Sequence, residues 1–163
     1  KPMLRATTQG WKIALFTGTG EPLPTRVEFS RRREEIVCST GMPDAGLLGH
    51  YRMAPFAARF YDSAAMSAQK LAALASPSRF ALRDLFDLHH LFKVVLVPPA
   101  EVARLVDPEV IDGALEKVGR FDFGHFKEQV LPYLSAGMIE LYRQAEAFER
   151  LKSEVEEPLL RMR

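Results

Sequence analysis

The stretch from Gln69 to Leu91, QKLAALASPSRFALRDLFDLHHL, decides the fold predicted for this chain. Apolar residues recur at helical spacing on both sides of Ser-Pro-Ser, and proline cannot continue the hydrogen-bond ladder of a helix. We therefore expect one helix from Ala64 to Ala75. A second helix, capped by Ser76 and with Pro77 in its first turn, should run to about Phe92.

The chain beyond this stretch also has a helical pattern. Asp107-Pro108 repeats the cap-then-proline signature and predicts a helix that Gly119 ends, followed by another near Phe123 to Leu134. Residues 136–160 predict one long amphipathic helix, either packed on the chain's own bundle or forming a partner groove or dimer seam. Its apolar residues alternate at spacings of three and four: Met138, Leu141, Ala145, Phe148, Leu151 and Val155.

The amino-terminal part has short strand-like patterns instead. Trp11–Phe16 and Arg26–Ser30, separated by a turn region, predict a hairpin in which Val27 and Phe29 share one face and Glu28 lies on the other. A third strand is expected near residues 35–38.

Residues 39–62 have no clear period, so we expect a connection there with one short extended piece. The predicted fold is α+β, with a small antiparallel sheet at the amino end followed by a helical bundle. The two parts are residues 1–62, with the strands and the connecting loop, and residues 63–163, with the helices.

The composition limits the classes of protein to consider. The chain has 163 residues, 47% of them hydrophobic, and a formal net charge of +1, so it is long enough for a core and carries no strong overall field. Its one cysteine, Cys38, excludes an internal disulfide. No apolar run reaches the roughly 18 residues of a membrane helix. We expect a cytoplasmic protein that does not contact the membrane.

A cluster of charged residues distinguishes the second predicted helix. Asp84 lies beside one polar stripe on this helix, and Lys70 belongs to the helix before it. The stripe is either a solvated face with ion pairs worth about 0–1 kcal/mol each, or a site for a triphosphate and its magnesium ion. Its members are Arg79, Arg83, Asp87 and His90.

Other motifs carry less information. His89 and His90 point about 100° apart on a helix, so they do not suit one metal ion. Gly18-Thr19-Gly20 lacks the remainder of a dinucleotide-binding motif and predicts a turn. The run Arg31-Arg32-Arg33 is either a solvated strip or a local contact to nucleic-acid phosphates.

Three segments together resemble the carboxyl-terminal half of the AbiEii/AbiGii-type nucleotidyltransferase toxin family. They are VEFSRR at residues 27–32, QKLAAL at residues 69–74, and Arg79 followed by RDLFDL at residues 83–88. The resemblance covers about residues 10–95. It implies a nucleotidyltransferase core, magnesium, a nucleoside triphosphate, and a role in a toxin-antitoxin or phage-defence (abortive infection) system, with transfer RNA or another RNA as acceptor and an antitoxin protein as partner.

The resemblance also implies roles for particular residues. Lys70 and Asp87 would be catalytic, with Asp87 acting as base for the attacking hydroxyl or orienting the arginines. Lys70, Arg79, Arg83 and Asp84 would bind the nucleotide, and Glu28 would occupy an acidic position near the metal ions.

One family motif is missing. The chain has no Gly-Ser turn followed by a strand with Asp-x-Asp, and Lys70 and Arg79 stand two residues farther apart than in the family pattern. We expect a protein whose amino-terminal portion is lost or separately encoded, or a degenerate member. The alternative is a non-catalytic interaction module that binds an antitoxin or a second copy through its helices.

Overall fold

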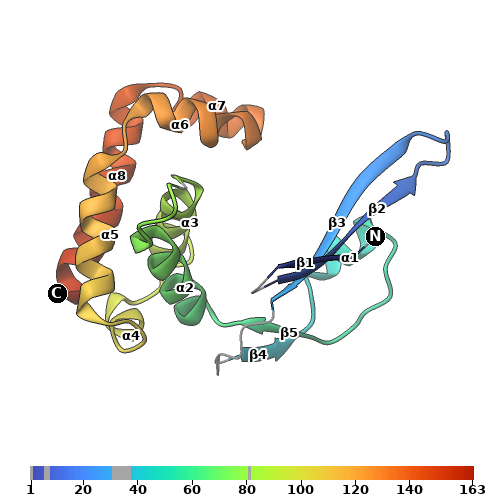
Figure 1. Ribbon diagram of the computed structural model, residues 1–163, viewed down its shortest axis with the longest axis horizontal. Coiled ribbons are helices and arrows are strands. Elements are labelled where there is room, and N and C mark those ends of the chain that lie inside the picture. Colours follow the sequence, from blue (N-terminus) through green and yellow to red (C-terminus); the bar gives the residue numbers. More distant parts are fainter. Residues whose placement is uncertain (1, 6–7, 31–37, 81) are drawn as a thin grey trace. The chain divides into compact units, whose positions relative to one another are not determined.

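The computed structural model describes residues 2–5, 8–30, 38–80 and 82–163 and has two compact units (Figure 1). The amino-terminal unit spans residues 1–36 and the carboxyl-terminal unit residues 37–163. The division into residues 1–62 and 63–163 drawn from the sequence stays a prediction.

The amino-terminal unit contains a three-stranded antiparallel sheet in the order β1, β2, β3. The strands are β1 (Pro2–Arg5), β2 (Thr8–Phe16) and β3 (Pro22–Ser30). The predicted hairpin is confirmed with longer strands, whereas β1 was not predicted. Val27 lies opposite Trp11, whose ring meets Phe29 edge to face, and Glu28 lies opposite Gly10. Since opposed residues share a face, Glu28 is on the other face, as predicted.

The segment predicted as a connection contains more structure than expected. It forms β4 (Cys38–Gly41), α1 (Ala45–His50) and β5 (Ala58–Tyr61), with β4 and β5 paired antiparallel. Asp44 caps α1 by accepting a hydrogen bond from the Leu47 N–H at 2.9 Å. Of the expected third strand, residues 35–37 lie outside the described part of the chain and Cys38 begins β4.

The first predicted helix is confirmed as α2 (Ser63–Ala75), with Asp62 as its N-cap. The predicted start of the second helix is wrong: α3 spans Leu82–Lys93, and residues 76–80 are not helical. Ser76 is the C-cap of α2. The carbonyls of Ser76 and Arg79 accept hydrogen bonds from the Lys117 side chain, so a contact distant in sequence replaces the expected helical turn.

The later helices partly follow the prediction. They are α4 (Pro99–Ala103), α5 (Pro108–Arg120), α6 (Phe123–Gln129), the short 3-10 helix η1 (Leu131–Tyr133), α7 (Ala136–Tyr142) and α8 (Ala145–Met162). The prediction of a single helix over residues 136–160 is wrong. The backbone is extended at Gln144, so α7 and α8 are separate helices. Leu141, expected on the apolar face of that helix, is exposed.

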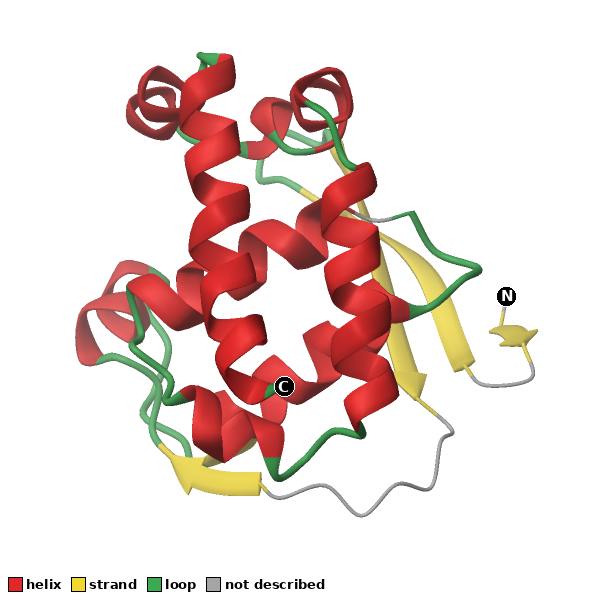
Figure 2. Cartoon of the chain, turned by 90° about the vertical axis from the view of Figure 1, so that its left-hand side faces the viewer, coloured by secondary structure: helices red, strands yellow, loops and turns green. Residues whose placement is uncertain are grey.

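The core of the carboxyl-terminal unit lies among the helices drawn red in Figure 2. In Figure 1, α5 and α8 run side by side, with α2 packed on α5 and α3 packed on α8. Leucines dominate the core in α2 and α3, and α8 contributes an apolar stripe at helical spacing. Fully buried members include Leu71, Leu74, Leu85, Leu88, Val118, Phe126, Phe148, Leu151, Val155 and Leu159.

The α+β fold predicted from the sequence is confirmed: small antiparallel sheets come first and helices follow. None of the helices formed by the described residues has the length and apolar character needed to span a bilayer.

Candidate functional site

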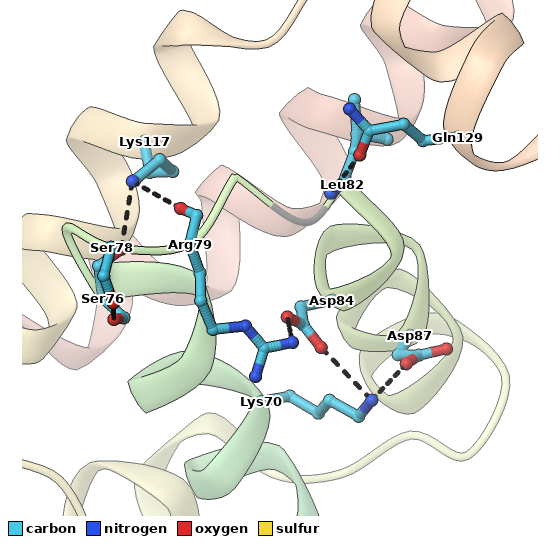
Figure 3. A network of polar contacts seen from close by, with 9 residues as sticks. All are labelled: Lys70, Ser76, Ser78, Arg79, Leu82, Asp84, Asp87, Lys117 and Gln129. Carbon is cyan, nitrogen blue, oxygen red and sulfur yellow. Dashed lines mark hydrogen bonds and ion pairs between the residues drawn. The ribbon is translucent and has the colours of Figure 1, made fainter.

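Four charged side chains from three segments meet in the carboxyl-terminal unit (Figure 3). Lys70 on α2 donates from Nζ to Asp84 Oδ1 at 3.3 Å and to Asp87 Oδ2 at 2.5 Å, both on α3. Arg79, in the connection between these helices, donates from Nη2 to Asp84 Oδ2 at 3.0 Å. We call these four residues the Lys70 cluster. The structure thus brings together four of the residues singled out in the sequence, without Arg83 or Glu28.

The members of the Lys70 cluster differ in their exposure to solvent. The Asp84 side chain is only 6% exposed, whereas that of Asp87 is 44% exposed. Asp84 uses one carboxylate oxygen for Lys70 and the other for Arg79. A buried carboxylate with two charge-assisted hydrogen bonds is well compensated and is hard to displace. Asp84 therefore fixes where the two cations lie, while Asp87 is the accessible acid.

The protonation of Lys70 reflects this environment. Partial burial alone lowers the pKa of its ammonium group, but the hydrogen bond and charge of Asp87, together with those of Asp84, outweigh burial and raise the pKa above the ordinary 10.5. Lys70 is consequently protonated and positively charged at neutral pH.

Two residues of the predicted stripe, Arg83 and His90, do not join the cluster. Arg79 is not on α3, so the stripe of four on one helix is wrong for this member. Arg83 lies on α3, but its guanidinium carbon is 4.9 Å from the centre of the Tyr133 ring, an arrangement typical of a cation–π contact. His90 is exposed on α3, whereas His89 is buried.

Glu28 belongs to the amino-terminal unit, where it forms an ion pair with Arg26 two residues earlier on β3. Its predicted role near the metal ions stays a prediction. The basic strip Arg31-Arg32-Arg33 lies outside the described residues.

Two further polar side chains support the connection that contains Arg79. Lys117, buried on α5, donates from Nζ to the Ser76 and Arg79 carbonyls at 3.1 and 2.9 Å. The Gln129 Oε1 accepts a hydrogen bond from the Leu82 N–H at 3.3 Å. Neither residue was predicted from the sequence. The available signal was a lysine on the apolar face of α5, among buried Ala114 and Val118.

The magnesium ion expected from the resemblance can be tested against this donor set. Among the described residues, no three His, Cys, Asp or Glu side chains gather closely enough to hold a metal ion. Asp84 and Asp87 have the Lys70 ammonium between them, so a cation already neutralises the carboxylates that would be ligands. The Lys70 cluster does not fit a magnesium site by itself.

The arrangement is suited to binding an anion. The four formal charges, two positive on Lys70 and Arg79 and two negative on Asp84 and Asp87, sum to zero. An incoming anion could replace the Asp87 carboxylate beside Lys70. Lys70 and Arg79 would then both contact the anion, while Asp84 kept its hydrogen bonds to both cations. An ammonium next to a guanidinium is a combination that recognises phosphate oxygens.

Comparison with known proteins adds no family or fold assignment: no protein-family model matches the chain, and no match was found among curated proteins or among solved structures.

Proposed function

We propose that the Lys70 cluster binds the triphosphate of a nucleoside triphosphate, and that the chain is a component of a nucleotidyltransferase-like toxin of the AbiEii/AbiGii type. The observation that carries this proposal is the bridging of Lys70 and Arg79 by one buried carboxylate, that of Asp84. A solvated helix face needs no buried acid, whereas a site for a highly charged ligand needs its cations fixed before the ligand arrives.

The proposal gives each residue of the cluster a separate task. Lys70 and Arg79 bind phosphate oxygens. Asp84 holds these two side chains in position. Asp87, the exposed partner of Lys70, leaves the ammonium when the phosphate arrives and then either accepts the proton of the attacking RNA hydroxyl or orients the cations.

The chemical step itself requires groups that this chain does not contain. Transfer of a nucleotide to RNA would use magnesium held by an Asp-x-Asp pair. We therefore propose for this chain the substrate-binding part of the reaction, with an RNA such as transfer RNA as acceptor and an antitoxin as the regulating partner.

The first experiment is a calorimetric titration of the protein with ATP, GTP, CTP, UTP and inorganic tripolyphosphate. Lys70→Met keeps much of the aliphatic chain and removes the charge, so we expect affinity to fall about tenfold, the effect of losing one charge-assisted contact. Lys93→Met is the matched control, because Lys93 lies on α3 and pairs with Glu157 at 3.6 Å outside the cluster.

Two results would contradict triphosphate binding. One is a wild-type protein that binds none of these ligands. The other is an equal loss of affinity in Lys70→Met and Lys93→Met, because that would mean a general effect of positive charge. Circular dichroism of both variants shows whether the fold is intact.

The alternative function, a module that binds a partner through its final helix, has less support. The apolar residues of α8 that would face a partner are buried in the chain's own core: Phe148, Leu151, Val155 and Leu159. These contacts favour the interpretation in which the helix packs on its own bundle. Light scattering of the purified protein tests the alternative, which requires a stable dimer or a captured antitoxin that Lys70→Met leaves unchanged.

A further inference from the structure

We propose that Lys117 is a positioning residue that fixes the connection between α2 and α3, so that the Arg79 guanidinium reaches Asp84. This inference rests on the proposed function only for its consequence in ligand binding, since the structural part concerns Lys117 and the connection alone. The Lys117 side chain comes from α5, contacts the connection from outside the Lys70 cluster, and does not itself bind the ligand in this proposal (Figure 3).

The burial of Lys117 indicates that protein groups replace the water around its ammonium group. The residue is 8% exposed, and burying an ammonium group is unfavourable unless hydrogen bonds replace its water. Nζ makes two such bonds, to the carbonyls of Ser76 and Arg79, and no carboxylate of the described residues forms an ion pair with it. Backbone carbonyls are therefore what the ammonium holds.

The end of α2 explains why a cation suits this place. Ser76 is the C-cap of α2, where the last carbonyls of a helix lack intrahelical partners and carry the negative end of the helix dipole. The Ser76 carbonyl accepts from the Lys117 ammonium and also from the Arg79 N–H at 3.2 Å. Lys117 thus stabilises the helix end and the turn that follows it.

The position of Arg79 follows from this turn. Lys117 holds the Arg79 carbonyl at 2.9 Å, and the Arg79 side chain extends from the same residue to Asp84 at 3.0 Å. Because the Arg79 side chain is 53% exposed, packing does little to fix it, and its backbone anchor decides where the guanidinium can reach. Without Lys117, the Ser76 and Arg79 carbonyls would accept hydrogen bonds from water, and the connection would sample other conformations.

Hydrogen exchange tests the structural part of the inference. In Lys117→Met we expect the Arg79 amide, which donates to Ser76, to exchange at least about tenfold faster, while amides in the middle of α8 keep their rates. Lys117→Arg, which keeps a cationic donor, should restore most of the protection. Unchanged exchange at Arg79 in a folded Lys117→Met protein would overturn the inference.

A double-mutant cycle tests whether Lys117 acts through Arg79. We expect Lys117→Met to weaken tripolyphosphate binding about tenfold in the wild-type background and to have no further effect in Arg79→Ala. An equal loss in both backgrounds would overturn the positioning role, because Lys117 would then act on the whole fold or on the ligand directly.

The remaining outcomes also separate the two proposals. If the wild-type protein does not bind tripolyphosphate, the proposed function fails, and exchange at Arg79 alone decides the role of Lys117. If Lys117→Met does not fold, Lys117→Gln replaces it, because the amide keeps an N–H donor without the charge. Faster exchange at Arg79 in a folded Lys117→Gln protein supports the inference, and unchanged exchange contradicts it.

Discussion

The Nε2 atom of His89 lies 2.7 Å from the Oε2 atom of Glu154 and joins α3 to α8. The His89 side chain is 10% exposed, and its ring meets that of Tyr142 edge to face. Because a buried imidazole nitrogen without a partner is unfavourable, this pair stabilises the contact between α3 and α8.

Glu154→Ala should lower the free energy of unfolding by about 1–3 kcal/mol, because it leaves the buried His89 nitrogen unpaired. Urea unfolding monitored by circular dichroism measures this loss. Glu157→Ala is the control on the same helix: its carboxylate is half exposed and pairs with Lys93 and Arg161 at the surface, so we expect a change within about 1 kcal/mol. Similar losses in the two variants would mean that burial of the His89 pair has no special effect.

Lys70→Met should change how stability depends on pH. The pKa of Lys70 is raised in the folded protein, so its pairing contributes stability that is fully present below the ordinary pKa of 10.5. This contribution is lost as the pH rises through the raised pKa. We therefore expect wild type to exceed Lys70→Met in urea midpoint at neutral pH, and the difference to shrink under strongly alkaline conditions. A difference that grows with pH would contradict this assignment.

Much of the fold could be predicted because its signals are local. The apolar helical pattern from Ala64, with Pro77 after it, is enough to place α2. Alternation along residues 26–30 is enough to place Glu28 and Val27 on different faces of β3. The meeting of Lys70 with Asp84 and Asp87 was also predictable, because a short connection keeps consecutive helices adjacent.

The missed features depend on residues distant in sequence. Pro77 at a helix start is a valid local signal, but residues 76–80 form a connection whose Ser76 and Arg79 carbonyls accept hydrogen bonds from Lys117, 38 positions beyond Arg79. At the break between α7 and α8, the Tyr142 ring likewise packs against Phe86 and Phe126 while Leu141 stays exposed. Such contacts leave no periodic pattern in the sequence.

We expect the phenol of Tyr142 to ionise at a higher pH than an ordinary tyrosine. Burial raises the pKa of its phenol above 10.0, and the negative charge of Glu154 raises it further. An ultraviolet titration of the chain's four tyrosines should show a phase above pH 10 that Tyr142→Phe removes. Glu154→Gln should move this phase to lower pH, because the neighbouring charge is gone. Persistence of the late phase in Tyr142→Phe would assign it to another tyrosine.

Gly119→Ala tests where α5 ends. The sequence alone predicts that Gly119 ends the helix, which would suit the left-handed backbone that glycine favours. In the structure, α5 continues to Arg120, and a Cβ atom at Gly119 would meet nothing within 4 Å. Alanine loses less backbone entropy than glycine on entering a helix. We therefore expect Gly119→Ala to raise the free energy of unfolding by roughly 0.5–1 kcal/mol.

Gly20→Ala is the contrasting variant for this test. Gly20 has a φ of +83° in the turn between β2 and β3, a conformation that alanine adopts only with strain. We expect Gly20→Ala to lower the thermal midpoint and Gly119→Ala to raise it, both measured by calorimetry. A lowered midpoint for Gly119→Ala would mean that Gly119 has the backbone of a helix end, and would restore the boundary predicted from the sequence.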